Sequence, residues 1–162
     1  MEIIELTAES VDAVAPLTAD FRVALSAFRG IDSPLDIAAG RAELLEYLQK
    51  SFPVYVALEK SRPVGYLVCR VEEPCVWVES LYVSPAFRRR GIASALFQTA
   101  ERLAASYGED TVYNCIHPNN EGIIAFLKAR GYTVLNLIEV RKPYGGEALH
   151  TKINLDGRLF DY

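Results

Sequence analysis

The fold is decided by the stretch Val83-Ser84-Pro85-Ala86-Phe87-Arg88-Arg89-Arg90-Gly91-Ile92-Ala93, which lies between a predicted strand and a predicted helix. Residues 75–83 are rich in β-branched and aromatic side chains, which is typical of a strand. After Gly91, apolar residues recur at helical spacing as far as Tyr107, and Gly108 ends the run. A strand, a short loop and a helix therefore follow one another.

This loop has the features of an anion-binding site. The start of a helix presents free backbone N–H groups and the positive end of the helix dipole. Small residues such as Gly91 and Ala93 let a phosphate approach the backbone, and Arg88, Arg89 and Arg90 add cations. For the arginines alone, the alternative is a solvated cluster on an ordinary turn. The loop contains neither a P-loop motif nor a dinucleotide-binding glycine pattern.

Two motifs in register resemble one known family. Arg88-x-x-Gly91-x-Ala93, preceded by Val83-x-Pro85, resembles the acetyl-CoA pyrophosphate loop of the GNAT N-acetyltransferase superfamily. The segment from Asn120 to Tyr132 resembles the family's pattern Asn-x-x-Ala-x-x-Phe-Tyr-x-x-x-Gly-Phe. The resemblance covers about half of the chain, from Pro53 to Tyr132.

The resemblance implies a fold and an activity. We expect one N-acetyltransferase domain over residues 1–162, of α/β class, with a mixed, mostly antiparallel central sheet of six to seven strands and about four helices. We expect it to transfer an acetyl group from acetyl-CoA to a primary amine of a small molecule or peptide, by direct attack in a ternary complex. A CoA-binding regulatory module without turnover is the alternative, because Leu127 stands where the family has a proton-donating tyrosine.

The family pattern also implies which residues bind the cosubstrate: Leu81, Tyr82, Val83, Arg88, Arg89, Arg90, Gly91, Ile92, Ala93 and Asn120. Backbone groups of Leu81 and Val83 would bind the pantetheine, and the Val83 amide would also serve the oxyanion. Asn120 would bind from the other side, although capping of its own helix would equally explain an asparagine there. With Leu127 in place of tyrosine, the candidates for protonating the thiolate are Tyr113, Tyr144, His117 and Cys115.

Glu79 is the predicted general base. It lies in an otherwise apolar strand four residues before Val83, where family members often have a carboxylate that activates water. A partly desolvated glutamate suits a base that works near neutral pH. Strand alternation places Glu79 with Leu81 and Val83, opposite Ser80 and Tyr82, unless splaying disturbs it. The alternative is a carboxylate that faces solvent.

The remaining elements follow from periodicity and turn residues. Thr7 can cap a helix through Phe28, in which Pro16 is unfavourable, and Pro34 suits the first position of a second helix. The predicted strands are 2–6, 54–58, 64–71, 75–83, 111–116, 132–140 and 149–155, and the later helices are 92–107 and 120–130.

Composition narrows the function class. A net charge of −4 and a pI near 5.3 argue against a surface for nucleic acid or anionic membrane. No apolar run approaches the roughly 20 residues of a membrane span, and the first residues do not resemble a signal peptide. Cys69, Cys75 and Cys115 lack metal-site spacing, so we expect core thiols, no metal site and a cytoplasmic protein. A homodimer is an expectation taken from the family.

Overall fold

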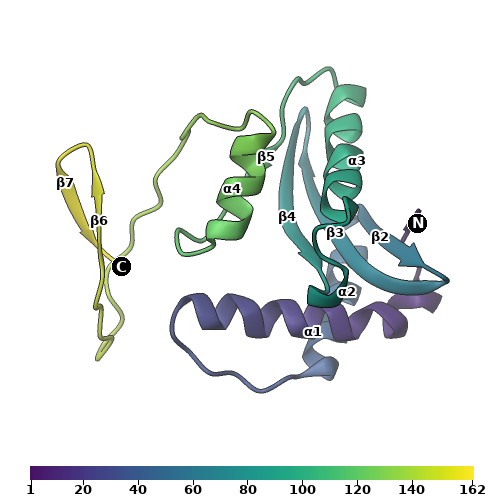
Figure 1. Cartoon of the computed structure of the whole chain (residues 1–162), viewed down its shortest axis with the longest axis horizontal. Coiled ribbons are helices and arrows are strands. Elements are labelled where there is room, and N and C mark those ends of the chain that lie inside the picture. The colour runs from purple at the N-terminus through teal and green to yellow at the C-terminus, as the bar shows by residue number, and fades with distance from the viewer. The chain divides into compact units, whose positions relative to one another are not determined.

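The computed structural model describes all residues, Met1–Tyr162, in two parts, Met1–Phe126 and Leu127–Tyr162 (Figure 1). The first part has a five-stranded sheet of order β1-β2-β3-β4-β5, and the second has a hairpin, β6-β7. The elements are β1 (Glu2–Glu5), α1 (Val11–Phe28), α2 (Ile37–Gln49), β2 (Val54–Glu59), β3 (Arg62–Glu72), β4 (Cys75–Val83), α3 (Ile92–Ser106), β5 (Tyr113–Asn114), α4 (Glu121–Ala129), β6 (Lys152–Leu155) and β7 (Arg158–Asp161). The α/β class and the four helices are confirmed, but the strands form two sheets.

The central sheet is mixed and mostly antiparallel, as predicted. β1 to β4 pair antiparallel in succession, and β5 joins β4 in parallel. The parallel pairing is short, because only Trp77 with Tyr113 and Val78 with Asn114 are in register. Beyond Val78, β4 continues to Val83 without a β5 partner, so the two strands separate there.

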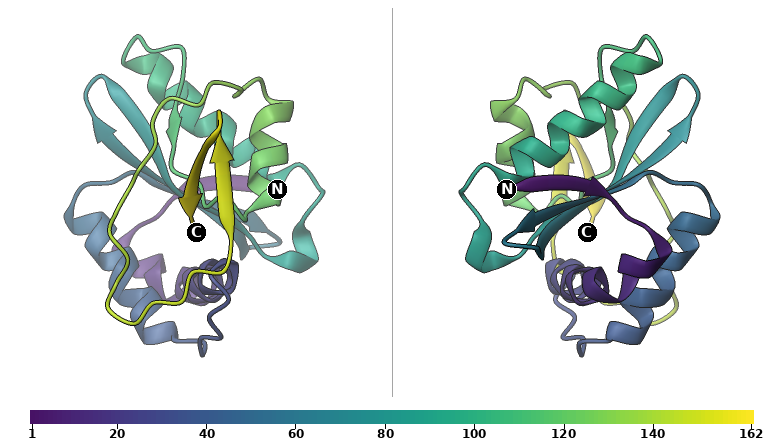
Figure 2. Two further views of the ribbon diagram at one scale, coloured as in Figure 1. Left: turned by 90° about the vertical axis from the view of Figure 1, so that its left-hand side faces the viewer. Right: turned by 90° about the vertical axis from the view of Figure 1, so that its right-hand side faces the viewer.

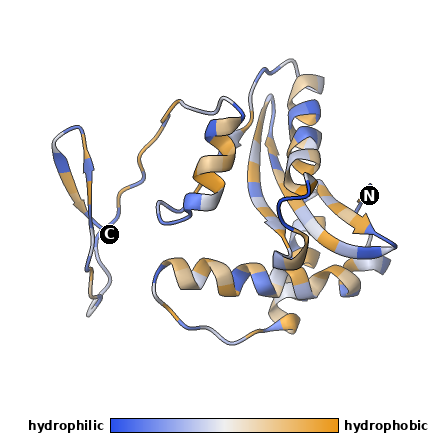
Figure 3. Cartoon of the chain, viewed as in Figure 1, coloured by the Kyte–Doolittle hydropathy of each residue, from blue (hydrophilic) through white to orange (hydrophobic).

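Helices cover the two faces of this sheet (Figure 2). Side chains of a strand alternate between the faces, which is visible as alternating hydropathy along β4 (Figure 3). In β3, by contrast, residues 64–69 are all buried, because both faces are covered. Tyr66 and Val68 of β3 pack in one core with residues of α1 and α2, including Val14 and Leu44. On the other face α3 is held by fully buried residues such as Leu96. The start of α3 therefore lies beside the end of β4.

α2 packs closely against α1 at Gly40. A Cβ at this position would lie 2.7 Å from the Ala15 carbonyl oxygen and 2.9 Å from the Ala19 nitrogen. We expect Gly40→Val to lower the free energy of unfolding by about 1–3 kcal/mol, because backbone atoms cannot move aside easily. Urea denaturation measures this. Gly145→Val is the control, since nothing lies within 4 Å of a Cβ there, and equal losses in both variants would contradict the packing argument.

Helix boundaries differ slightly from the prediction. α1 begins at Val11 after a short 3₁₀ turn that follows Thr7, and it accommodates Pro16. α2 does not begin at Pro34: its cap is Asp36, whose Oδ1 accepts a hydrogen bond of 2.8 Å from the Ala39 amide. A side-chain acceptor therefore decides this helix start rather than the fixed φ of proline.

The C-terminal prediction was largely wrong. No strand forms over residues 132–140; the apolar side chains there, such as Val134 and Leu137, are exposed. The predicted strand 149–155 is reduced to β6, which pairs with the unpredicted β7 around the turn at Asp156 and Gly157. The strand predicted over 111–116 is reduced to β5. Strand composition is not sufficient, because a strand also needs a partner with free ladder groups.

Cysteine placement corrects another expectation. Cys69 is buried in β3, where burial raises the pKa of its thiol to about 12. Cys75 is half-buried and Cys115 is exposed, so only one of the three is a core thiol.

Candidate functional site

Glu79 lies where β4 leaves β5. The register between β3 and β4 shifts there, because Val68 pairs with Ser80 whereas Cys69 pairs with Val78. Glu79 therefore has no partner on β3 and forms a β-bulge, which bends the strand and redirects a side chain. It is also the first residue after the last β4–β5 pair. The bulge thus interrupts the alternation of side chains along β4 at Glu79, an outcome that the sequence analysis left open.

The backbone beyond the bulge faces the opening between β4 and β5, called the seam below. The Ser84 amide donates to the Val64 carbonyl at 2.9 Å, so the hydrogen-bonded pairs of this ladder fall at every second residue, including Tyr82. Leu81 and Val83 occupy the alternate positions, and their N–H groups are directed away from β3. The seam is therefore lined by the N–H groups of Leu81 and Val83, which have no strand partner. These are the backbone groups predicted from the sequence to bind the pantetheine.

Tyr82 does not face the seam. Its side chain is buried against Phe21 and Tyr66, with ring centroids 5.7 and 6.5 Å away, and its backbone pairs with Tyr66. Burial raises the pKa of its phenol. Its side chain belongs to the core on the α1 side, and its backbone is paired with β3.

The Arg88 side chain contacts the end of β4 that borders the seam. Its Nε donates to the Val83 carbonyl at 2.9 Å, and its guanidinium lies over the Tyr82 ring at 5.6 Å. The side chain is therefore turned toward β4. Arg88 fixes the path of the loop, and its guanidinium is already bound before any anion arrives.

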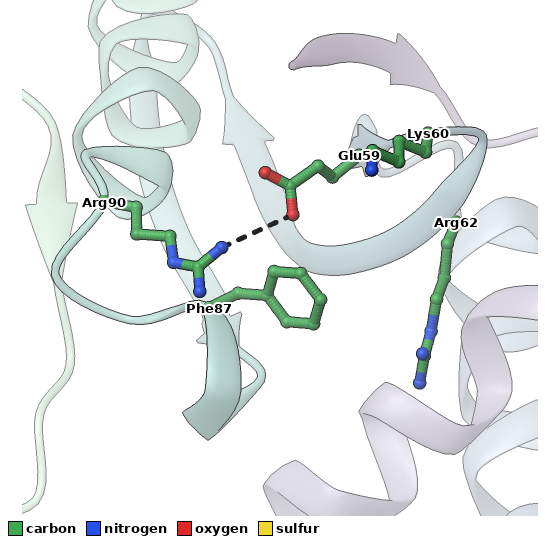
Figure 4. A pocket seen from close by; sticks show the side chains of 5 residues that line it. All are labelled: Glu59, Lys60, Arg62, Phe87 and Arg90. Atoms are coloured by element: carbon green, nitrogen blue, oxygen red, sulfur yellow. Dashed lines mark ion pairs between the residues drawn. The ribbon is translucent and has the colours of Figure 1, made fainter.

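Arg90 is directed toward the β2–β3 turn (Figure 4). Its guanidinium lies 3.7 Å from Glu59 and over the Phe87 ring at 5.2 Å. With Lys60 and Arg62 these residues line an open hollow of about 440 Å³. Of the three consecutive arginines, two are thus engaged by the protein itself, and Arg89 is exposed.

Backbone amides form the anion-binding feature of this loop. Arg89 and Gly91 both have left-handed backbone, with φ of 62° and 81°. Gly91 is followed directly by the right-handed residues of α3, and such a change of hand turns successive N–H groups to one side, as in an anion-binding nest. Gly91 caps α3, and the first intrahelical bond runs from the Ala95 amide to the Gly91 carbonyl at 3.0 Å. The amides of Ile92, Ala93 and Ser94 precede that bond and lack a helical acceptor. The Ile92 side chain is buried, so only its backbone can serve the site.

Asn120 caps α4 in this structure. Its Oδ1 accepts from the Ile123 amide at 3.2 Å, which confirms the capping interpretation. The side-chain NH₂ group is left for a ligand, so capping and cosubstrate binding are compatible. The preceding loop is tied to the end of α1: Asn119 donates to the Phe28 carbonyl at 2.9 Å, and the His117 ring stacks on Phe28 at 5.7 Å. Burial lowers the pKa of His117, and nearby Arg29 lowers it further.

Substitution of Asn120 separates the two roles. Asn120→Asp keeps the cap acceptor and removes the NH₂ donor, so we expect unchanged stability and roughly tenfold weaker CoA binding, the loss of about one hydrogen bond. Asn120→Ala should also cost about 1 kcal/mol of stability. Calorimetric titration with CoA and thermal unfolding measure the two effects. If Asn120→Asp bound CoA with full affinity, Asn120 would serve only as the cap of α4.

On the helix side, Glu79 faces an open hollow of about 460 Å³. Its lining comes from α1, α2 and β4: Arg22, Ala39, Ala42, Glu43, Glu46, Tyr47, Lys50 and Glu79. The Glu79 side chain is 42% exposed and its Oε2 lies 3.5 Å from Arg70 Nε. The expected desolvation of Glu79 is therefore modest, and an arginine that the sequence analysis did not consider lies beside it.

A partly buried polar cluster forms the floor of this hollow. Arg22 binds the Glu43 carboxylate, and the Tyr47 hydroxyl donates to Glu43 at 2.5 Å and lies 3.5 Å from the Ser80 hydroxyl. Burial and Glu43 raise the pKa of Tyr47 to about 12. The cluster connects α1 and α2 to the residue that follows the bulge, and it keeps Tyr47 a neutral hydrogen-bond donor.

The candidates for protonating a thiolate lie in different parts of the structure. Tyr113 pairs with Trp77 in the two-residue β4–β5 ladder, one residue before the Val78–Asn114 pair that borders the seam, and its ring stacks on Trp77 with centroids 4.8 Å apart. Cys115 follows β5 and is exposed, and His117 stacks on Phe28. Tyr144 belongs to the part Leu127–Tyr162. Tyr113 is the candidate that lies in the strand pairing next to the seam.

Sequence reasoning missed Arg70, Trp77 and Tyr47. The register of the predicted hairpin contained a signal for two of them, because pairing Val71 with Val76 places Arg70 opposite Trp77. No sequence signal indicated Tyr47, which reaches Ser80 only through the packing of α2 on the sheet.

Comparison with known proteins identifies the family. Residues 23–132, more than half of the chain, match the model of the acetyltransferase (GNAT) family. The chain belongs to this GNAT family. The members of this family are acetyltransferases, and their acyl donor is acetyl-CoA. A search of curated protein sequences finds no match.

Solved GNAT structures support the fold. One is the aminoglycoside N-acetyltransferase AAC(6')-Iy with a bisubstrate analogue, CoA-S-monomethyl-acetylneamine: TM-score 0.67, 18% identity, 89% of this chain and 98% of that chain covered. Another is ribosomal-protein-alanine N-acetyltransferase from Brucella melitensis biovar Abortus 2308: TM-score 0.70, 18% identity, coverage 89% and 99%. A variant of BH1408 from Bacillus halodurans has TM-score 0.73, 18% identity and coverage 89% and 100%. No helix of the chain combines the length and apolarity of a membrane span.

Proposed function

We propose that this GNAT protein transfers an acetyl group from acetyl-CoA to a primary amine of a small molecule or peptide, in a ternary complex. One observation carries the proposal: the unpaired backbone of β4, the bulged Glu79 and the free amides at the start of α3 lie along one continuous segment, residues 79–94. This arrangement offers donors for an anionic diphosphate at one end and a carboxylate at the other.

The residues have distinct roles in this proposal. The amides of Gly91 to Ser94 bind the diphosphate, assisted by the exposed Arg89, while Leu81 and Val83 bind the pantetheine through their backbone. Asn120 adds its NH₂ group from the start of α4. Arg88 and Arg90 fix the loop through Val83 and Glu59.

The reaction then requires two proton transfers. Glu79 accepts a proton from the acceptor ammonium, directly or through a water molecule, because only a neutral amine has a lone pair. The amine nitrogen forms a bond to the thioester carbon, and the Val83 amide stabilises the oxyanion. The C–S bond breaks, the attacking nitrogen loses its second proton, and the thiolate takes up a proton through Tyr113 or solvent. The products are the N-acetylated amine and CoA, and the first proton is released from Glu79 to solvent.

A CoA-binding regulatory module is the second candidate, and one observation favours it. Leu127, buried on α4, stands where the family has its tyrosine proton donor, and leucine has no proton to give. For turnover to occur, Tyr113 or solvent must protonate the thiolate. A thiol is a tolerable leaving group with a pKa near 8.5 even without a dedicated acid.

Thiol release distinguishes the two functions. The protein is incubated with acetyl-CoA and a panel of polyamines, aminoglycosides, amino acids and peptides while free thiol is followed. We expect release above the rate of hydrolysis with at least one amine, and an N-acetylated product of matching mass. Calorimetric binding of acetyl-CoA without release on any acceptor would favour the regulatory module, and absence of binding would overturn both.

A further inference from the structure

The Glu79 carboxylate is contacted by a side chain that is itself held in place. Arg70 of β3 directs Nε toward Glu79 Oε2 at 3.5 Å, and its Nη1 donates to the Glu72 carboxylate. The same guanidinium lies over the Trp77 ring, 5.1 Å from its centroid. The Arg70 side chain is 29% exposed, less than either carboxylate that it contacts. Arg70 thus has three partners that fix the plane of its guanidinium.

These partners follow from strand register. Arg70 pairs with Trp77 across β3 and β4, and Trp77 pairs with Tyr113 across β4 and β5. Arg70, Trp77 and Tyr113 therefore stack in one row over three strands, with Trp77 and Tyr113 inclined by 29°. The row ends one residue before the Val78–Asn114 pair that borders the seam, so the position of Arg70 depends on the same short β4–β5 pairing.

Glu79 needs such a partner because the ladder does not orient it. As the bulged residue it has no opposite residue on β3, and bulges leave the extra side chain less constrained. The other charged or titratable groups around the hollow are Arg22, Glu43, Glu46, Tyr47 and Lys50, with Glu72 beyond Arg70. Glu43 is bound by Arg22 and Tyr47, and Glu46 by Lys50. Arg70 is the cation that the structure pairs with Glu79.

We propose that Arg70 is a positioning residue for Glu79, holding its carboxylate in one orientation beside the hollow through the stacked row with Trp77 and Tyr113. The catalytic consequence rests on the proposed function, whereas the contact itself does not. Without Arg70 the bulged carboxylate loses its fixed partner, so the Glu79 side chain should adopt more than one orientation.

The first measurement needs no acceptor. The side-chain carboxyl carbons of ¹³C-glutamate-labelled protein are observed by NMR at one neutral pH, and the Glu79 resonance is assigned by its loss in Glu79→Gln. In Arg70→Gln we expect the Glu79 resonance to move or broaden, because its fixed partner is lost. Arg102→Gln, which makes the same charge change on the exposed side of α3, should leave it unchanged. An unchanged Glu79 resonance in Arg70→Gln would overturn the proposal.

The second measurement uses the amine with the fastest thiol release. In Arg70→Gln we expect kcat to be about five- to tenfold lower with KM within twofold. Arg70→Lys should not restore kcat, because lysine cannot reproduce the stacked, forked contact. Tyr47→Phe should reduce stability without lowering kcat. A changed Glu79 resonance with an unchanged kcat would overturn the catalytic consequence, whereas the absence of turnover with any amine would reject the proposed function and leave the NMR result standing.

Discussion

Glu79→Gln is expected to lower kcat/KM by about 10²- to 10³-fold near neutral pH, the usual contribution of a general base. Glutamine keeps the size of the side chain and its contact with Arg70, but it cannot accept the amine proton. CoA binding should be unchanged, because Glu79 lies at the opposite end of the segment from the α3 amides. Thiol release and calorimetric titration with CoA measure the two quantities on the same preparation.

The pH dependence makes this prediction specific. Without a base, only the fraction of amine that is already neutral can react, so the rate of Glu79→Gln should rise about tenfold per pH unit toward the amine pKa near 10. The deficit relative to the unsubstituted protein should therefore shrink in alkaline solution. Glu2→Gln, on β1 at the far edge of the sheet from β5, is the charge-matched control and should stay within twofold. Parallel pH profiles for Glu79→Gln and the unsubstituted protein would exclude Glu79 as the base.

The sequence predicted the parts of the site that local pattern determines. Gly91 and the apolar spacing after it predicted a helix start, and the run before the loop predicted β4; both are confirmed. The left-handed backbone of Gly91 was not predicted. Asn120 was predicted with two roles, of which the cap is observed. These features depend on neighbours within a few residues, so composition and spacing contain them.

Other parts depend on contacts that the sequence does not display. The bulge at Glu79 arises from the register between β3 and β4, and no residue type marks it. The three arginines looked equivalent in the sequence, yet Arg88 binds the Val83 carbonyl and Arg90 pairs with Glu59 on a distant turn. Likewise, residues 132–140 have strand composition but no strand forms there. Long-range pairing decides each of these cases.

Gly91→Val is expected to weaken CoA binding by at least about 100-fold. Gly91 has φ of 81°, and a β-branched residue is strongly disfavoured in that region. A Cβ at Gly91 has nothing within 4 Å, so the protein has room for the side chain and the conflict is with the backbone angle. If φ relaxes, the nest amides turn away from one another and CoA binding is lost. If φ is kept, the strain lowers the free energy of unfolding by about 1–3 kcal/mol. Calorimetric titration with CoA measures the first effect and urea denaturation the second.

Gly108→Val separates the effect of backbone strain from the effect of losing the amides that bind the diphosphate. Gly108 follows the other end of α3, has φ of 82° and also has nothing within 4 Å of a Cβ, so the substitution imposes the same conflict away from the loop. We expect a similar loss of stability in both variants and normal CoA affinity in Gly108→Val. If both variants lost affinity equally, general destabilisation would explain the result. If Gly91→Val bound CoA normally, the amides at the start of α3 would not be the diphosphate site. The proposed transfer would then have no binding site for acetyl-CoA, its acyl donor.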